Sequence, residues 1–331
     1  MNMKTSMTYT LHTKFFSYKN LKIQRIPLLL ALLSVGLWSC SSVSNDTELI
    51  SDADLDMAAE IMGSAISDQE SGIVNSIYDA FSTVSSTGIS YNKKTIFSAK
   101  NIHDDSKNYG GRGLERAFTH SYDSTTGVHT LSFERSFTKG PFTNTTSTLQ
   151  EFIYTDLDGN FIARPKVNRD AINTISLASQ KSGSINNPKR SSEFTKIDTM
   201  LFTGLHASES LVELSGKHRS FGSGVAVLRD SSSYSRSFSV FITFDNITID
   251  KDTVNAYGNL ENGLTGTLTY SIVMNKVTNG TPEESIMEGT VDLSEDGTAL
   301  MQFYKYDYIY RLGLRNGDIK ERGRRGKPLG K

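Results

Sequence analysis

The chain has 331 residues, of which 37% are hydrophobic and 21% are charged, and its formal net charge at pH 7 is −1. This apolar content is enough for one large folded domain or two small ones, and it argues against disorder throughout. Because the sequence holds a single cysteine, an intramolecular disulfide, a redox-active cysteine pair and a cysteine-rich zinc site are all excluded.

Residues 1–39 have the order of a secretion signal, with basic residues, then an apolar run, then a small residue before the cysteine. The segment holds five basic residues and no acidic one, and its apolar run from Ile26 to Trp38 is 13 residues long. A helix needs roughly 20 residues to cross the bilayer core, so we expect cleavage and not a permanent span. Cleavage leaves 30 of the 35 Lys and Arg beside 36 Asp and Glu, a net charge of −6. This charge argues against nucleic acid as a partner.

The segment Leu37–Cys40 resembles the lipobox of bacterial lipoproteins, in which a Leu, a variable residue and a small residue precede the cysteine that is acylated. The resemblance implies that Cys40 is lipidated, becomes the first residue of the mature protein and anchors it to a membrane. Each buried CH₂ of an acyl chain contributes ~0.8 kcal/mol, so two or three chains make a lasting anchor. Ser41 stands where an Asp would retain an enterobacterial lipoprotein in the inner membrane. An outer-membrane location is therefore favoured, and the choice between its periplasmic and surface sides is left open.

Residues 40–51 are rich in Ser, Asn and Asp and predict a flexible tether. Residues 52–86 predict a helical segment of two short amphipathic helices, the first of which begins with three acidic residues that favour the positive end of the helix dipole. The apolar positions at helical spacing are Leu55, Ala58, Ala59, Met62, Ala65 and Ile66 in the first helix and Ile73, Val74, Ile77, Tyr78 and Phe81 in the second.

Residues 87–319 predict an antiparallel β domain, because apolar residues recur there with a period of two. The pattern is clearest over 264–274, 287–293 and 308–314. Four dipeptides that tolerate positive φ suit hairpin turns between strands. They are Asn262-Gly263, Asn279-Gly280, Asp296-Gly297 and Asn316-Gly317. The fold class is thus mainly β, a meander that forms a curved sheet, half-barrel or sandwich, with a bulge expected near Asp245.

Two hairpins are predicted upstream, one joining 116–122 to 128–137 and the other joining 149–154 to 161–163. Residues 168–192, rich in Ser and Asn, predict a loop-rich excursion from the sheet with at most one short element. Residues 320–331 are basic and glycine-rich, and predict a disordered tail.

Three patterns in the sequence resemble parts of metal or catalytic sites. Asp156–Asn160 resembles the start of a calcium loop, but Val167 occupies the position of the required Glu, so a turn is favoured. His120 and His129 share one face of a hairpin if the loop has four residues, yet no third metal ligand can be placed. S-x-x-K spacings begin at Ser90 and Ser136 without the elements that accompany them in serine hydrolases. We therefore expect no metal, no cofactor and no enzymatic activity.

Four tyrosines at alternate positions form a candidate ligand surface, because on a continuous strand they would line one face as an aromatic ladder. If residues 305–307 make a turn, the tyrosines are ordinary cross-strand pairs, and this interpretation is favoured. The four residues are Tyr304, Tyr306, Tyr308 and Tyr310.

The order of helices first and a β meander after them is similar to that of uncharacterised envelope lipoproteins of the Bacteroidota. That resemblance implies a lipid-anchored envelope protein but no functional residue. The leading hypothesis is a non-enzymatic β domain that binds a partner or ligand. The alternative is a carrier of lipid or another hydrophobic ligand in a helix-covered half-barrel, which needs an apolar lumen. A hydrolase comes third, and only a buried group of His, Asp and Ser from distant parts of the chain would raise it.

Overall fold

The computed structural model describes residues 50–68, 71–82, 118–139, 141–165, 167–187, 190–227, 233–278 and 281–326. The chain divides into two units, Met1–Glu48 and Leu49–Lys331, and the described residues belong to the second. The predictions for residues 1–39, for lipidated Cys40 and for most of the 40–51 tether lie outside the described residues. The same is true of Ser90 and of the end of the basic tail.

Two helices open the described part of the chain, as their apolar spacing predicts. Helix α1 spans Asp52–Ile66 and helix α2 spans Ile73–Ser82. The Ser51 hydroxyl caps α1 by accepting a hydrogen bond from the Asp54 backbone N–H at 3.2 Å, and acidic residues occupy the first turn. Because α2 is buried on almost every side, its position is fixed by packing and not by its sequence propensity alone.

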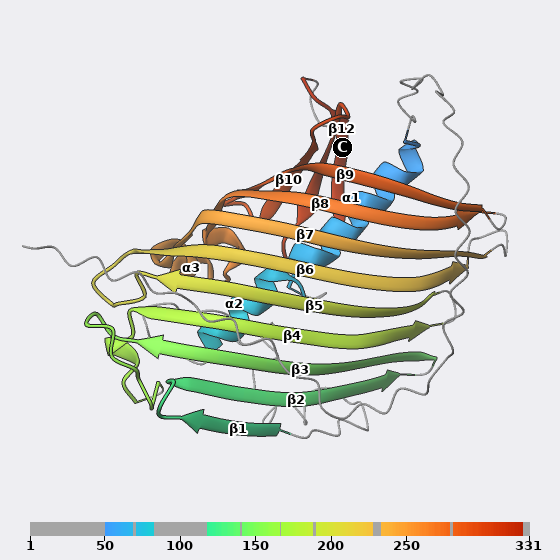
Figure 1. Ribbon diagram of the computed structural model, residues 1–331. Coiled ribbons are helices and arrows are strands. Elements are labelled where there is room, and N and C mark those ends of the chain that lie inside the picture. The colour runs from blue at the N-terminus through green and yellow to red at the C-terminus, as the bar shows by residue number, and fades with distance from the viewer. Residues whose placement is uncertain are drawn as a thin grey trace, which may run out of the picture. The chain divides into compact units, whose positions relative to one another are not determined.

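The strands form one antiparallel meander in which each strand pairs with the next along the chain (Figure 1). In the described residues the sheet has twelve strands, and its edge strands β1 and β12 do not pair with each other, so the sheet is not closed. This confirms the mainly β antiparallel fold and identifies it as an open, curved sheet. The strands are β1 (Phe118–Asp123), β2 (Val128–Lys139), β3 (Phe142–Thr155), β4 (Thr174–Asn187), β5 (Arg190–Thr203), β6 (Leu211–Val227), β7 (Ser233–Asp250), β8 (Leu264–Thr278), β9 (Thr281–Ser294), β10 (Thr298–Phe303), β11 (Tyr308–Gly313) and β12 (Ile319–Arg324).

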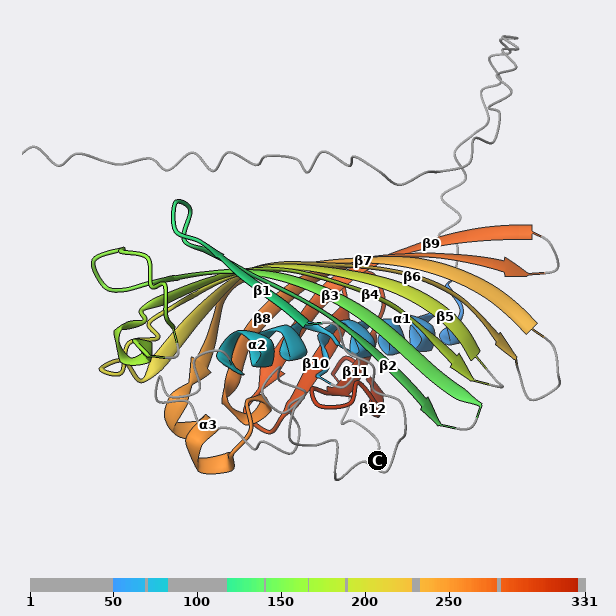
Figure 2. The same ribbon diagram turned by 90° about the horizontal axis from the view of Figure 1, so that it is seen from below.

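The sheet arches over α1 and α2, which lie against its inner face (Figure 2). Strand β8 shows how the period of two divides the faces: Leu268 and Ile272 are buried in the core, while Thr267 is exposed on the other face. A space of about 10 Å³ remains where α1 and α2 meet β6 to β9, and apolar side chains such as Ile77 and Phe244 line it. A cavity of this size holds about one water molecule, so the inner face is a packed core.

Helix α1 is also fastened to the last two strands of the sheet by a group of charged and aromatic side chains. Arg322 on β12 forms ion pairs with Asp52 at 2.9 Å and with Asp56 at 3.2 Å. The Tyr310 hydroxyl donates to Asp56 at 2.7 Å, and the Arg322 guanidinium lies 4.7 Å from the centre of the Tyr308 ring. These contacts join the start of the described chain to its end.

Several turns and one bulge agree with the sequence. Gly127, Gly297 and Gly317 have φ of +70°, +75° and +74° at the connections where hairpin turns are predicted. The pairing of β7 with β8 shifts register between Phe244 and Thr248, which confirms the predicted bulge. Asn262-Gly263 instead ends a 3₁₀ turn (Glu261–Gly263) that follows helix α3 (Lys251–Tyr257), so this connection is not a tight hairpin.

Three predictions from the sequence are wrong. Residues 168–192 are not an excursion, because 174–187 form strand β4, which pairs with β3 and β5 and whose polar residues Ser179 and Lys181 are buried. The second hairpin does not form either, since Phe161 makes only an isolated bridge to Thr155 and β3 pairs with β2 and β4. The basic tail is ordered as strand β12 through Arg324, because Arg322 and Arg324 pack on the Tyr308 ring.

Candidate functional site

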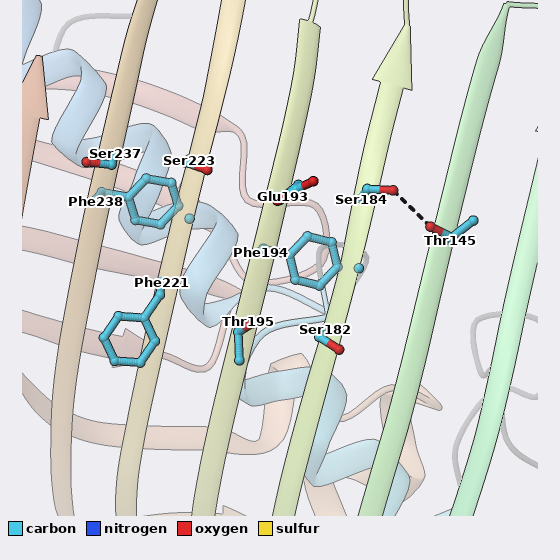
Figure 3. A pocket seen from close by; sticks show the side chains of 12 residues that line it. Thr145, Ser182, Ser184, Glu193, Phe194, Thr195, Phe221, Ser223, Ser237 and Phe238 are labelled. Atoms are coloured by element: carbon cyan, nitrogen blue, oxygen red, sulfur yellow. Dashed lines mark hydrogen bonds between the residues drawn. The ribbon is translucent and has the colours of Figure 1, made fainter. Parts of the chain in front are cut away.

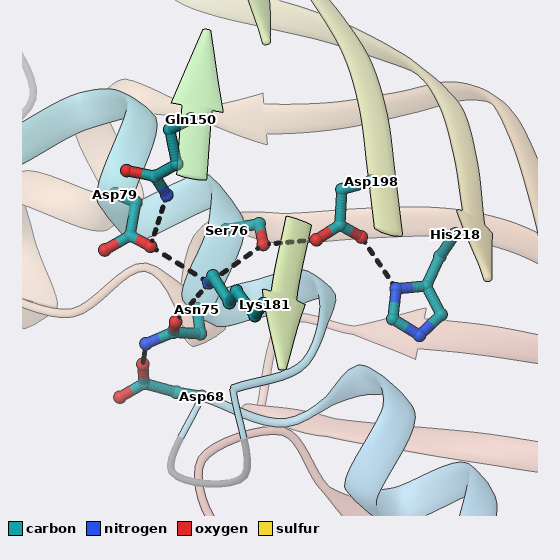
Figure 4. A network of polar contacts seen from close by, with 8 residues as sticks. All are labelled: Asp68, Asn75, Ser76, Asp79, Gln150, Lys181, Asp198 and His218. Atoms are coloured by element: carbon teal, nitrogen blue, oxygen red, sulfur yellow. Dashed lines mark hydrogen bonds and ion pairs between the residues drawn. The ribbon is translucent and has the colours of Figure 1, made fainter. Parts of the chain in front are cut away.

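A buried polar network joins α2 and the turn before it to four neighbouring strands, β3 to β6 (Figure 4). The network occupies core positions of the inner sheet face, where an apolar side chain is the usual occupant. Its members are Asp68, Asn75, Ser76, Asp79, Gln150, Lys181, Asp198 and His218.

Lys181 on β4 is the cation at the centre of this network, and its side chain is 3% exposed. Its Nζ lies 2.9 Å from an Asp79 carboxylate oxygen and donates to the Asn75 side-chain oxygen at 2.5 Å and to the Ser76 hydroxyl at 3.1 Å. The Gln150 amide donates to the same Asp79 carboxylate at 2.8 Å. The ammonium group therefore has three α2 partners, as a buried charge requires.

Asp198 on β5 and His218 on β6 form the second part of the network, and neither side chain is exposed. His218 Nδ1 lies 2.6 Å from one Asp198 oxygen, and Ser76 donates to the other at 2.6 Å. Burial by itself raises the pKa of Asp198, but the nearby His218 and Lys181 outweigh it and hold that pKa below its usual value. Asp198 is therefore a buried carboxylate anion.

Asp68 closes the network at its other end, where it accepts a hydrogen bond from the Asn75 amide at 3.0 Å. Burial raises the pKa of Asp68 to about 6, and the hydrogen bond from Asn75 offsets only part of this effect. This carboxyl group is thus half-protonated near pH 6.

A hydrolase would need a buried Ser, Asp and His from distant parts of the chain, and Ser76, Asp198 and His218 are such a group. The order in which hydrogen bonds connect them is unsuitable for catalysis. In a nucleophilic triad the histidine receives the serine proton, and the aspartate holds the other side of the histidine ring. Here Ser76 and His218 both bind Asp198, and in the described residues His218 Nε2 has no hydrogen-bond partner. The group is a structural ion network with no activated nucleophile.

The outer face of the sheet is the face that α1 and α2 do not cover, and we call it the helix-free face. Large apolar side chains stand on it with more than a third of their surface exposed. Phe241 is paired across the strands with Arg219, whose guanidinium lies 5.2 Å from its ring centre. The exposed apolar residues on this face are Leu149, Ile197, Leu201, Phe221, Val225, Phe241, Val277 and Ile286.

A shallow trough of about 560 Å³ crosses β3 to β7, the part of the sheet shown in Figure 3. Strand alternation places the side chains of Ser182, Glu193 and Phe221 on the helix-free face. Most of the other side chains that line the trough on this face are Ser or Thr. Because these side chains are short, the surface is lower there than at the larger side chains around it. The lining residues are Thr145, Ser182, Gly183, Ser184, Glu193, Phe194, Thr195, Phe221, Gly222, Ser223, Ser237 and Phe238.

Two glycines form the floor of the trough, and aromatic rings cover them from behind. Phe194 is paired with Gly183, and Phe238 is paired with Gly222. A Cβ added at Gly222 would lie 2.3 Å from the Phe238 ring, and one at Gly183 would lie 2.9 Å from the Phe194 ring. Any larger residue would displace these rings, so the glycines allow close packing behind the floor.

The structure brings together only one of the residue sets selected from the sequence as metal or ligand sites. His120 and His129 are diagonal neighbours across a four-residue loop, with 3.4 Å between Nε2 and Nδ1. His129 Nε2 lies 3.1 Å from the Ile162 carbonyl oxygen, and burial lowers the pKa of His129. Within the described ranges no group of three or more His, Cys, Asp or Glu is placed to hold a metal.

The calcium-like segment is a turn, because Asp156 uses its own oxygens within it. One Asp156 oxygen accepts from the backbone N–H groups of Asp158 and Asn160 at 2.9 and 2.8 Å. The Asn160 side-chain amide donates to the other Asp156 oxygen at 3.1 Å, and this hydrogen bond together with those from the backbone lowers the pKa of Asp156. The oxygens thus bind the segment's own N–H groups, as in an Asx turn.

The four tyrosines do not form a continuous ladder, which corrects the candidate ligand surface. Strand β10 ends at Phe303 and β11 begins at Tyr308, so the favoured turn is confirmed. Tyr304 is 59% exposed, whereas Tyr306 packs on Phe303 with ring centres 6.0 Å apart. Tyr308 donates to Asp52 at 3.2 Å and Tyr310 donates to Asp56, so both tyrosines fasten helix α1.

The patterns in the sequence predicted neither the polar network nor the trough. Asp198 precedes Met200 and Phe202 at spacings of two and four, on the face whose apolar residues are buried. A charged residue that continues an apolar face is the signal that could have identified it. The trough has no such signal, because it depends on which strands are neighbours.

No family model, no curated protein and no solved structure matches this chain. Among the described residues, no helix has both the length and the apolar character that crossing a membrane requires.

Proposed function

We propose that this protein is a lipid-anchored lipoprotein of the bacterial cell envelope, without enzymatic activity, that binds an envelope ligand through the helix-free face. The anchor is Cys40, the only cysteine, which stands at the end of the lipobox-like segment. The folded unit supplies the binding surface.

The exposed apolar side chains of the helix-free face carry this proposal. A sheet with one face on the core and one face in water normally shows polar residues on the wet face. Here Ile197, Phe221 and Phe241 lie close together around Arg219, beside a trough of about 560 Å³. Apolar groups that cluster on a surface and border a concavity favour a binding site.

The packing of the inner face gives less support to a carrier of hydrophobic molecules. A carrier needs a lumen between the helices and the sheet, whereas the space left there is about 10 Å³. An acyl chain would have to displace α1 or α2, and α2 is tied to the sheet by the ion pair of Lys181 with Asp79. The helix-free face needs no such displacement.

Hydroxyl-radical footprinting tests the binding function without knowledge of the ligand. Oxidation of Phe221 is compared between intact cells and the same lipoprotein purified in detergent. We expect several-fold less oxidation in cells, because a bound ligand covers the ring. Tyr257 and Tyr304 are 65% and 59% exposed, lie away from this face and serve as internal controls. Equal oxidation of Phe221 in both samples, after scaling to the controls, would reject the function.

A further inference from the structure

The trough on the helix-free face is lined mainly by hydroxyl groups arranged in two rows across the strands. The register places Ser184, Glu193 and Ser223 side by side in one row, which Thr145 and Ser237 extend at its ends. The second row holds Ser182, Thr195 and Phe221. The rows thus run perpendicular to the strands and present one carboxylate and one aromatic ring among the hydroxyls.

This chemistry excludes several kinds of ligand. Among the described residues that line the trough there is no Lys or Arg to neutralise a phosphate backbone or an anionic headgroup. Glu193 is the one carboxylate in the described part of the lining, which is too few for a metal site. Strands β3 to β7 each pair on both sides, so their backbone groups are not free to receive an added peptide strand. An acyl chain would leave the hydroxyl groups without partners.

A chain of neutral sugar rings fits what remains. Serine and threonine hydroxyls donate and accept hydrogen bonds, as sugar hydroxyls do, and the Glu193 carboxylate accepts them from two directions. Phe221 is 46% exposed and offers a flat apolar face to the C–H groups of a ring. The four gaps between five strands span about 19 Å at ~4.8 Å each, which suits several linked rings better than one.

We propose that this trough binds a short segment of an uncharged polysaccharide, with the sugar chain running across the strands. One ring stacks on Phe221, and neighbouring hydroxyls bind Glu193 and the Ser and Thr side chains. The proposal rests on the binding function proposed above and names the ligand class of the same face.

Isothermal titration of the full lipoprotein in detergent micelles tests the ligand class. The probes are hexasaccharides of glucose, mannose, xylose, galactose and N-acetylglucosamine. We expect saturable binding of at least one of them. Phe221→Ala should weaken that binding roughly fivefold through loss of stacking, and Glu193→Gln should weaken it by a similar factor while keeping the shape of the side chain.

Phe161→Ala is the matched control, because Phe161 is a phenylalanine of similar exposure, 49%, that does not line the trough. It should change the affinity less than twofold, and circular dichroism should show all three variants folded. Absence of binding by every hexasaccharide overturns the polysaccharide proposal, as does equal weakening by Phe221→Ala and Phe161→Ala. Protection of Phe221 in cells combined with no sugar binding would leave the binding function standing and reject only its ligand class.

Discussion

Substitution of Lys181 by Met is expected to destabilise the protein more than almost any other single change in the sheet. Methionine keeps the length of the side chain and removes the charge that binds Asp79, Asn75 and Ser76. The Asp79 side chain is 12% exposed, so its carboxylate would then lose its cation in a largely dry site. Removal of one member of a buried ion pair costs about 3–5 kcal/mol of unfolding free energy.

A second variant separates the cost of the unpaired charge from the cost of altered packing. Lys181→Met combined with Asp79→Leu removes both charges and leaves two apolar side chains, and such replacement of a buried ion pair is often neutral or stabilising. We therefore expect the double variant to recover at least about 2 kcal/mol relative to the sum of the single variants.

Thermal unfolding of the lipid-free Cys40→Ala protein, followed by circular dichroism at about 218 nm, compares the stability of these variants. At ~2–4 °C per kcal/mol, Lys181→Met should lower Tm by roughly 6–20 °C. A loss below about 1 kcal/mol, or a double variant as unstable as the sum of the singles, would refute the role of Lys181 as a buried charged centre.

Three other outcomes are expected. Replacement of Leu268 by Asp should lower Tm far more than replacement of Thr267, because a buried unpaired carboxylate costs several kcal/mol; equal losses would contradict the assignment of faces. Burial raises the folded pKa of Asp68 to about 6 from 3.8, so the folded state binds more protons between these values and stability falls as pH rises through them. Asp68→Asn should therefore flatten the pH dependence of Tm between about pH 4 and 6 and raise Tm at pH 7, and an unchanged profile would argue against this burial effect. Cys40→Ala should abolish metabolic labelling with a fatty-acid analogue and release the protein into the soluble fraction, whereas retained label would reject the anchor.

The helices and most of the C-terminal strands could be predicted because local signals determine them. The period of 3.6 over 52–66 and the period of two over 264–278 each put apolar residues on one face, and turn glycines such as Gly297 mark strand ends. Strand β4 was missed because local signals point the other way there. Its Ser179 and Lys181 look like solvent-exposed residues, but they are buried beneath α2.

The candidate sites depend on contacts between distant segments, which a single sequence does not specify. Ser76 meets Asp198 across 122 residues, and Lys181 meets Asn75 across 106 residues. Likewise, Ser184, Glu193 and Ser223 form one row only because of the register of three strands. A shift of one residue in any pairing would move a side chain to the opposite face and remove the trough.

The fastening of α1 to β12 sets the order in which the chain can reach its final form. Asp56 on the first helix binds Tyr310 and Arg322, which follow it by 254 and 266 residues. A secreted chain that leaves the translocation channel with its N-terminus first cannot make these contacts until nearly all of it has emerged. Contacts so distant along the chain form late and slowly. Helix α1 therefore cannot reach its final packing before β12 has emerged, so the proposed cleavage and lipidation at Cys40 could be completed while the rest of the chain is still unfolded.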